Sequence, residues 1–497
     1  MFSLGFDVGS SSVKAALYDV ERGTTVAQST YPQNEMPMTA AKAGWAEQDP
    51  EMWWDALRNA TREVLSKSAV DPADIRAIGI SYQMHGLVVV DKERRPLRES
   101  IIWCDSRAVA IGEKAFDSIG RSRCLSRMLN SPGNFTASKL RWVRDNEPGL
   151  FAKIDKFMLP GDFIAMKMTG EPRTTMSGLS EGILWDFVAG SVSDAVLAEY
   201  AIDRSLVPDL VPTFGDQGGL TSSAAAELGL RPGTRVTYRA GDQPNNAFSL
   251  NVLEPGQVAS TAGTSGVVYG ISDAMKYDPE TRVNTFAHVN HSGEVNRFGI
   301  LLCINGTGIS YSWIRRLTGN SLSYEELNTL AEDAPVGSKG LRFINFGNGA
   351  ERMLVNRDPG ASLERLNFNL HGRAETVRAI VEGVAFSFKY GIDIMAQLGM
   401  DAEEINAGHT NMFLSPVFTK TLATLSGATI NMYDTDGSVG AARGAAFGAG
   451  IYGSFKEAFI NLRKIMTVEP DKNNSDAYLS AYSDWLSLLS SKLKREG

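Results

Sequence analysis

The chain has 497 residues, of which 43% are hydrophobic and 21% are charged, and its 49 Lys and Arg against 57 Asp and Glu give a formal net charge of −8 at pH 7. This length predicts about two to four domains with a sizeable core, and the composition excludes global disorder. The mildly acidic balance gives no reason to expect nucleic acid or an anionic membrane as the main partner.

The cysteine content and the first residues indicate the compartment. Cys104, Cys124 and Cys303 form no CxxC pair and are odd in number, so we expect neither a disulfide framework nor a cysteine-rich zinc site. The opening MFSLGFDVGSSS lacks a basic region and carries Asp7, so we expect no signal peptide. No apolar run approaches the ~20 residues that span a bilayer. We therefore expect a cytoplasmic protein with no membrane partner.

The first half of the chain alternates short strand-like runs with longer helical patterns, which is typical of α/β architecture. Strands are expected at 2–6, 13–18 and 25–30, joined by tight loops. A helix is expected over 50–67, because Asp49 suits an N-cap and Pro50 suits the first helical position. Residues 76–90 predict two short strands around the polar insert QMHG.

A second segment, which begins near residue 236, repeats the opening pattern. A strand at 236–240 ends in GDQ, and a strand at 258–260 leads through AGTSG into another at 267–270. A long, mostly buried helix is expected at about 374–398. Because each half contains a strand, a Gly/Ser/Thr turn and a strand, we expect two related α/β lobes with a cleft between them. We place the N-terminal lobe at 1–248 and the C-terminal lobe at 249–497.

Three glycine-containing turns are candidate phosphate sites. In the first, GSSS at 9–12 follows Asp7 and precedes Lys14; its backbone N–H groups and hydroxyls can cradle phosphate, and the aspartate can hold Mg²⁺ through waters. The others are AGTSG at 262–266 and NGTG at 305–308. Each turn alone also fits a plain structural turn, but two similar turns, one per lobe, would hold a polyphosphate from both sides. The GxxxxGK[ST] pattern is absent.

Polar residues at strand ends are candidates for substrate chemistry. Asp242, beside amides, can accept the proton of a substrate hydroxyl, as phosphoryl transfer requires; an Asx-turn aspartate is the alternative. His85 can hydrogen-bond a sugar hydroxyl or be structural. Trp103 can stack on a sugar's apolar face and Asp105 can bind paired hydroxyls; the alternative is a surface salt bridge beside a core tryptophan.

Together these segments resemble the FGGY family of carbohydrate kinases, and within it the xylulokinase branch. The resemblance covers nearly the whole chain. The segments that carry it are FDVGSSSVKAALYD (6–19), GWAEQDPEMWW (44–54), QMHG (83–86), WCDSR (103–107), TASKLRWVRDNEP (136–148), AGDQPNN (240–246), AGTSG (262–266) and GSVGAARGAAFGAG (437–450). Two segments depart from the family pattern, AGHTNM (407–412) where consecutive glycines are usual, and TTMSGLSEG (174–182).

The resemblance implies an α/β fold of two actin-like (ribonuclease-H-like) lobes with an interlobe cleft, as in the superfamily of sugar kinases, actin and heat-shock ATPases. It implies ATP and Mg²⁺ as cofactors and transfer of the γ-phosphoryl group to a ketose, with D-xylulose, giving D-xylulose 5-phosphate, as the favoured substrate. Alternatives are another ketose or a polyol (ribulose, fuculose-type or rhamnulose-type), a non-sugar actin-like ATPase, or a catalytically inactive sugar sensor. A sugar and ATP are the expected partners, and a homodimer is compatible with the family.

The resemblance also implies roles for individual residues. Asp242 would be the general base and Asp7 would support Mg²⁺. The residues expected to bind sugar are Met84, His85, Trp103, Asp105, Asp242 and Asn246. The residues expected to bind nucleotide are Gly9, Ser10, Ser11, Ser12, Lys14, Gly263, Thr264, Gly306, Gly408 and Asn411.

Overall fold

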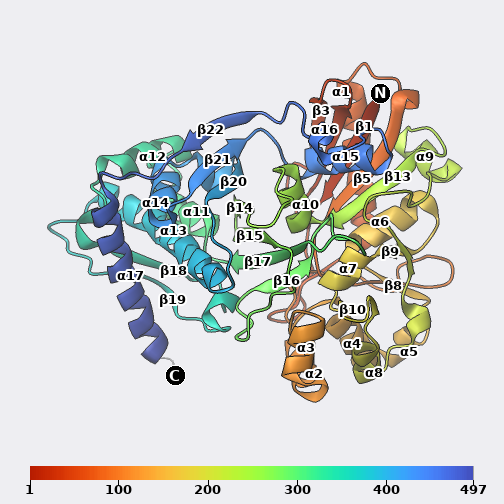
Figure 1. The fold of residues 1–497 in the computed structure, drawn as a ribbon, viewed down its shortest axis with the longest axis horizontal. Coiled ribbons are helices and arrows are strands. Elements are labelled where there is room, and N and C mark those ends of the chain that lie inside the picture. Colours follow the sequence, from red (N-terminus) through yellow and green to blue (C-terminus); the bar gives the residue numbers. More distant parts are fainter. Residues whose placement is uncertain (496–497) are drawn as a thin grey trace.

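The computed structural model describes residues 1–495, which form two lobes, each built on one mixed sheet (Figure 1). The sheet of the first lobe has five strands in the order β13-β5-β1-β2-β3. Their bounds are β1 Phe2–Val8, β2 Val13–Asp19, β3 Thr24–Tyr31, β5 Ile75–Tyr82 and β13 Arg235–Gly241. β1 runs antiparallel to β2 and parallel to β5, and β13 runs parallel to β5.

The second lobe repeats this arrangement within a seven-stranded sheet, in the order β16-β17-β15-β14-β20-β21-β22. Its strands are β14 Val258–Ala262, β15 Gly266–Ser272, β16 Asn284–Ala287, β17 Phe298–Ile304, β20 Glu404–Gly408, β21 Thr429–Tyr433 and β22 Lys464–Val468. The inner five, β17-β15-β14-β20-β21, match β3-β2-β1-β5-β13 in order and in direction, two antiparallel pairings followed by two parallel ones. The expected pair of related α/β lobes is confirmed.

The helices flank the two sheets. Their bounds are α1 Pro50–Lys67, α2 Val109–Ile119, α3 Arg121–Arg127, α4 Thr136–Asn146, α5 Pro148–Phe151, α6 Pro160–Thr169, α7 Met176–Glu181, α8 Asp194–Tyr200, α9 Ser222–Leu228, α10 Asp242–Ser249, α11 Gly308–Leu317, α12 Tyr324–Asp333, α13 Arg373–Gln397, α14 Pro416–Ser426, α15 Gly437–Gly448, α16 Phe455–Ala458 and α17 Ser475–Arg495. The helix predicted at 50–67 is confirmed, and the Asp49 side chain accepts the Glu51 N–H as its cap. No helix within residues 1–495 is long and apolar enough to cross a membrane.

Smaller strand pairs connect these elements. They are β4 Glu47–Gln48 with β7 Ser100–Ile101, β6 Val88–Val90 with β8 Lys156–Met158, β9 Arg173–Thr175 with β12 Asp209–Val211, β10 Trp185–Asp186 with β11 Ser191–Val192, and β18 Arg342–Phe346 with β19 Gly360–Glu364. The predicted strands coincide with strands of the structure, but the strands of the structure continue further; β1, for example, ends at Val8 and not at residue 6. Asp7, expected in a turn, still pairs with Lys14 and Ser81, because the ladder continues through this polar residue.

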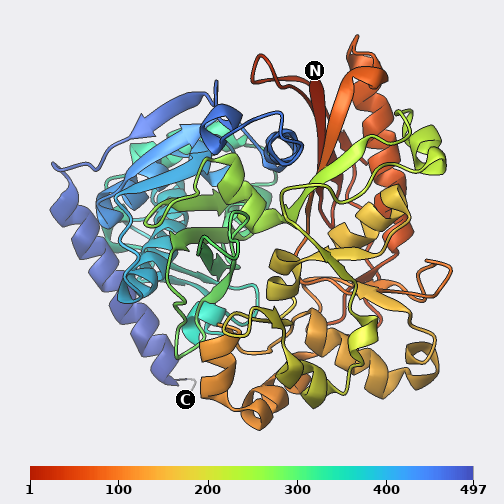
Figure 2. The same ribbon diagram turned by 45° about the vertical axis from the view of Figure 1, so that its right-hand side comes forward.

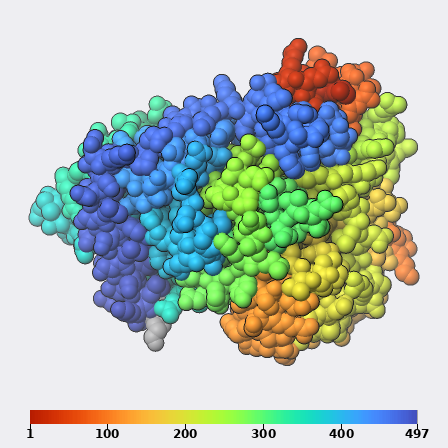
Figure 3. All heavy atoms as spheres, in the orientation of Figure 1, coloured from red at the N-terminus to blue at the C-terminus, as the bar shows by residue number. Residues whose placement is uncertain are grey.

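Helix α15 packs on the first lobe, although it belongs to the second half of the chain. It lies against β1 and β5 of the first lobe, where Ser3 Oγ donates to the Ala442 carbonyl at 2.8 Å. A Cβ atom at Gly5 would lie 2.0 Å from the Ser438 carbonyl oxygen, so only glycine permits this approach. Figures 2 and 3 show the blue C-terminal segment reaching the red N-terminal strands. Cutting the chain at 248/249 would therefore remove a helix from the first lobe.

Candidate active site

Three parallel strands of the first lobe end at the same edge of the sheet. Asp7 of β1 lies opposite Ser81 of β5, and Gly241 of β13 lies opposite Tyr82 of β5. The segments that follow these strands, 9–12, 83–86 and 242–246, therefore start side by side. The carboxyl ends of parallel strands are the usual place for ligands in α/β sheets.

A cavity of about 280 Å³ opens at this edge. It is lined by Asp7, Gly9, Ser10, Ser11, Ser12, Lys14, Gln83, Trp103 and Asp242. The structure thus brings the first candidate phosphate loop together with the residues predicted as general base and as magnesium support. Two carboxylates, one ammonium group and a turn rich in hydroxyls face one small space, which suits the charges of a phosphoryl group and its metal ion.

The Asp7 carboxylate is held between the two halves of the chain. Its Oδ1 accepts a hydrogen bond from Ser81 Oγ at 2.9 Å. A Cβ atom at Gly437, the first residue of α15, would lie 2.5 Å from Asp7 Oδ2. Burial raises the pKa of Asp7, nearby Lys14 lowers it and Asp436 raises it. Proteins bind Mg²⁺ through one or two carboxylates, waters and substrate phosphates, and Asp7 in this cavity fits that donor set.

Asp242 begins α10, directly after β13. Burial raises its pKa to about 7, and the charge of Asp7 contributes to the same shift. A carboxyl group with this pKa can both accept and release a proton near neutral pH. Asn246 follows four residues later, so it lies on the same side of α10 one turn further from the cavity.

His85 lies in the turn after β5 with a positive φ of 61°, a conformation that non-glycine residues seldom adopt. Its ring packs against Phe135 of the first lobe and Phe286 of the second, at centroid distances of 4.7 and 5.3 Å. Burial lowers the pKa of His85 to about 3, so the imidazole is neutral. A neutral imidazole can donate and accept hydrogen bonds, as recognition of a hydroxyl requires.

Two buried side chains hold the backbone of this turn. Lys139 Nζ donates to the carbonyls of His85 and Ile102, each at 2.9 Å, and burial lowers the pKa of this lysine to about 7. On the other side, Glu181 Oε2 accepts the His85 N–H at 3.4 Å. Met84 is also buried, and a Cβ atom at Gly241 would lie 2.6 Å from its Cγ. The turn and the end of β13 are therefore packed as one unit.

The second candidate phosphate loop faces a separate cavity of about 760 Å³ in the second lobe. Its lining includes Gly263, Thr264, Gly308 and Asn411, together with Tyr311 and Tyr324. The loop is tied to the N-terminus of α11, because the N–H groups of Gly308 and Ile309 donate to the carbonyls of Gly263 and Thr264. A glycine turn fixed beside a helix start, in a cavity with aromatic walls, suits a nucleotide.

The comparisons with known proteins agree with this geometry. Residues 2–249 match the N-terminal domain of the FGGY family of carbohydrate kinases. The xylulose kinase of Escherichia coli (strain K12) is 30% identical over 482 residues, covering 96% of either chain. The chain belongs to the FGGY family of carbohydrate kinases. It is therefore a phosphotransferase with an alcohol group as acceptor, and its family uses ATP.

Solved structures of this kinase family have the same fold. A xyloylose kinase from Brucella ovis is 26% identical, with a TM-score of 0.88 and coverage of 99% of both chains. A gluconate kinase from Lactobacillus acidophilus reaches the same TM-score at 21% identity, with coverage of 99% of this chain and 98% of its own. The second likeness shows the fold alone. The expected two-lobed actin-like fold of this kinase is confirmed.

Trp103 and Asp105 of the kinase have different surroundings. Trp103 is 45% exposed at the cavity, and its Nε1 donates to Ser10 Oγ at 3.3 Å. Asp105 is fully buried: its carboxylate accepts the Ala46 N–H and three hydrogen bonds from the Arg107 side chain. The expectation that Asp105 binds sugar is therefore corrected, because its oxygens are occupied by the protein. The alternative expectation, a surface salt bridge beside a core tryptophan, agrees better with the structure, because Asp105 pairs with Arg107. This ion pair is buried, however, and not at the surface.

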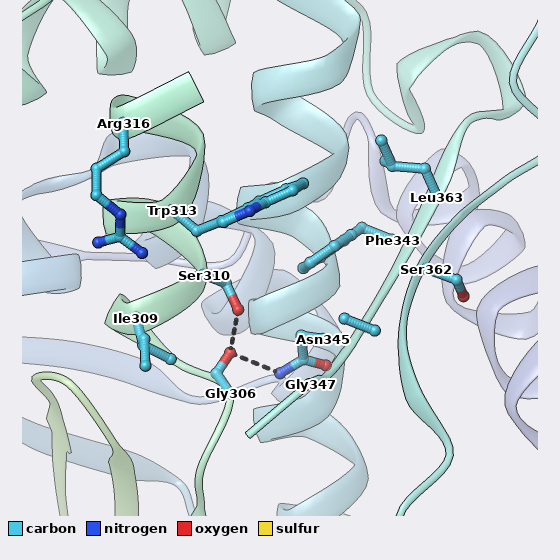
Figure 4. A pocket seen from close by; sticks show the side chains of 11 residues that line it. Gly306, Ile309, Ser310, Trp313, Arg316, Phe343, Asn345, Gly347, Ser362 and Leu363 are labelled. Atoms are coloured by element: carbon cyan, nitrogen blue, oxygen red, sulfur yellow. Dashed lines mark hydrogen bonds between the residues drawn. The ribbon is translucent and has the colours of Figure 1, made fainter. Parts of the chain in front are cut away.

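Gly306 and Gly408, expected to bind nucleotide, do not line the cavity that holds Gly263. Gly306 lines a third cavity of about 390 Å³, where Trp313 stacks on Phe343 (Figure 4). A Cβ atom at Gly306 would lie 1.7 Å from the Asn345 carbonyl oxygen, so this glycine serves close packing. Gly408 ends β20.

Two side chains of the site were not singled out from the sequence. Glu181 lies in TTMSGLSEG, and an acidic residue among small and apolar ones was a signal that it is buried and paired. Gln83 opens the QMHG insert, but the prediction assigned roles only to Met84 and His85. Glu181 and Gln83 both lie at the end of β5, and only the folded structure shows this position.

Proposed function

We propose that this chain is a xylulose kinase, which transfers the γ-phosphoryl group of ATP to D-xylulose and forms D-xylulose 5-phosphate. The observation that carries the proposal is the shared cavity of Asp242 and the Ser10–Ser12 turn at the ends of β13 and β1. The xylulose kinases of Escherichia coli and Bacillus subtilis, which align with 96% and 97% of this chain, support the choice of sugar.

In the proposed mechanism, Asp242 accepts the proton of the attacked hydroxyl. Its pKa of about 7 lets it take that proton at neutral pH. Lys14 and the N–H groups of the 9–12 turn balance the charge on the phosphoryl oxygens. We propose Asp7 as the residue that holds Mg²⁺, which when bound supplies further neutralisation of the phosphates. Neutral His85 hydrogen-bonds the sugar, and Trp103 and Asn246 complete its site.

The second lobe holds the rest of ATP in this proposal. Gly263 and Thr264 contact phosphates, and Asn411 lies beside the adenosine in the larger cavity. The division at 248/249 then separates a mainly sugar-binding lobe from a mainly ATP-binding lobe, except that α15 of the second half packs on the first lobe. A cytoplasmic location belongs to the same proposal, because the three cysteines are free thiols.

The test is ADP release with Mg·ATP against a panel of ketoses, aldoses and polyols that includes D-xylulose, ribulose and rhamnulose. Selective turnover of D-xylulose is expected. Turnover of another sugar would retain the kinase mechanism and overturn the choice of substrate. Absence of sugar-dependent turnover across the panel would contradict the mechanism, and ATP-driven filaments in sedimentation would then support a structural ATPase.

A further inference from the structure

The side chain of Gln83 is buried beside the catalytic cavity with no protein partner. It is 3% exposed, and neither Oε1 nor Nε2 has a hydrogen-bond partner. Within residues 1–495, it is the one side chain with two buried polar atoms that both lack a partner. Its backbone is fixed, because its N–H donates to the Val8 carbonyl at 2.9 Å. The orphaned carboxamide thus extends from a fixed backbone position at the junction of β1 and β5.

A buried glutamine in the same region shows what a structural amide looks like here. Gln48 is 1% exposed, and its Nε2 donates to the carbonyls of Ser10 and Pro37. Its Oε1 accepts the Trp53 indole N–H at 3.1 Å. Both ends of Gln48 are therefore paired within the protein, and its Nε2 supports the phosphate turn. Gln83 makes none of these contacts, and a buried polar group without a partner destabilises the fold, which calls for a compensating function.

The position of Gln83 indicates what its partner is. It lines the same cavity as the Ser10–Ser12 turn and Lys14, the proposed phosphate site, and Asp242, the proposed base for the attacked hydroxyl. Phosphoryl oxygens are hydrogen-bond acceptors, whereas sugar hydroxyls can donate. A neutral carboxamide offers one donor end and one acceptor end, so it satisfies both substrates at once without adding charge beside two carboxylates.

We propose that the Gln83 carboxamide binds both reacting substrates, its Nε2 donating to an oxygen of the transferring phosphoryl group and its Oε1 accepting from a sugar hydroxyl. The proposal rests on the kinase function above and adds a substrate-binding residue to it. A donor aimed at the charge that develops during transfer acts mainly on kcat, and an acceptor for a sugar hydroxyl acts on the sugar KM.

Gln83→Met tests the proposal, because methionine keeps the length of the side chain and removes both polar ends. We expect kcat for the preferred sugar to fall about 10²-fold, as for loss of one donor to a transition state. We expect the sugar KM to rise about tenfold, with the ATP KM within about threefold. The melting temperature should stay equal or rise, because an unpaired buried amide is replaced by an apolar group.

The control is Gln217→Met, another buried glutamine, whose Nε2 donates to the carbonyls of Pro212 and Thr213 and which lines none of the three cavities described above. Here the melting temperature should fall while kcat is retained. Kinetic constants of Gln83→Met within threefold of wild type would overturn the proposal. The partner of the Gln83 carboxamide would then be water and not a substrate. A melting temperature that falls as for Gln217→Met would also overturn it.

Gln83→Glu keeps the acceptor and the shape, so it remains informative if the methionine variant does not fold. We expect a retained sugar KM and a kcat at least 10²-fold lower, because the donor is lost and a carboxylate joins Asp7 and Asp242. Unchanged kcat would overturn the proposal. Wild-type turnover of the sugar panel is measured in parallel, so a failure of the kinase function is seen without any variant.

Discussion

Glu181 contacts His85 twice. Its carboxylate Oε2 accepts the His85 backbone N–H at 3.4 Å, and its own carbonyl oxygen lies 3.0 Å from the imidazole Nδ1. Its Oε1 accepts the Tyr82 hydroxyl at 2.5 Å, and the side chain is only 2% exposed. The backbone and the ring of His85 are thus both set by one residue of α7. The neighbouring Ser180 accepts the Ala287 N–H, so α7 also contacts the second lobe.

The first prediction is that Glu181 positions His85. Glu181→Ala should raise the sugar KM about tenfold and lower the melting temperature, because it leaves the Tyr82 hydroxyl and the His85 N–H unpaired. Glu181→Gln should restore both, since burial raises the pKa of Glu181 and already favours the uncharged form that Gln resembles. Steady-state kinetics and thermal melting check both variants. A Gln variant as impaired as the Ala variant would contradict the positioning role.

The second prediction concerns Asp242 as the general base. Asp242→Asn and Asp242→Ala should lose roughly 10²–10⁴-fold in turnover while ATP binding survives. Because burial raises the pKa of Asp242 to about 7, kcat/KM for the sugar should fall about tenfold per pH unit below pH 7 in the wild type. Near-normal turnover of either variant would remove this role from Asp242.

The same shift predicts a pH-dependent stability. The pKa of Asp242 is higher in the folded protein than its ordinary value of 3.8, so its favourable contribution to folding is full below about pH 4 and is lost as the pH rises through about 7. Asp242→Asn cannot ionise. Its melting temperature should therefore exceed that of the wild type at pH 8, and the difference should shrink towards pH 4.5. A constant difference across this range would count against the raised pKa.

The third prediction separates packing from sugar binding at Asp105. Arg107, only 1% exposed, stacks on Trp45 and Trp142 and pairs with Asp105, so the motifs at 44–54, 103–107 and 136–148 meet here. Removing one partner of a buried ion pair costs about 3–5 kcal/mol. Asp105→Ala should thus lower the melting temperature by several degrees, with the sugar KM within about threefold at low temperature. A tenfold higher KM with unchanged melting would restore the sugar-binding role.

The sequence alone placed three segments of the first cavity at the ends of strand-like runs. Asp7, QMHG and Asp242 each follow a run with the pattern of a buried strand, and parallel strands bring such ends together. The duplicated turn at 262–266 likewise predicted the second lobe. Local pattern was enough to place these turns, whereas the parallel pairing of β1, β5 and β13 is shown by the structure.

Side-chain environments could not be predicted in the same way. The motif WCDSR predicts ligand binding equally for Asp105 and Trp103. In the fold, however, Asp105 is buried against Arg107 and Trp103 is exposed. Gly306 and Gly263 stand in similar glycine turns, but only the packing of β18 against the first shows that it serves a close approach. These outcomes depend on contacts between residues far apart in the chain, for which periodicity carries no signal.

The last prediction uses the contact between α15 and the Asp7 carboxylate. Gly437 has no positive φ, so alanine fits the backbone there, but its Cβ would lie 2.5 Å from Asp7 Oδ2 and 2.8 Å from Cγ. Gly437→Ala must therefore displace either the carboxylate or the start of α15, which packs on β1 and β5 of the first lobe. We expect turnover to fall at least tenfold at fixed Mg·ATP and the requirement for Mg²⁺ to rise, since Asp7 is the proposed metal support.

Gly149→Ala is the matched control, because a Cβ atom there meets nothing within 4 Å and the residue lies in the short helix α5, at a position with no positive φ. Its kinetics and melting temperature should match the wild type. Magnesium titrations of initial rate, run on both variants and the wild type, separate the outcomes. If Gly437→Ala lowers the melting temperature but leaves the magnesium dependence unchanged, then α15 moves and Asp7 does not, and the proposed role of Asp7 loses its support from this contact.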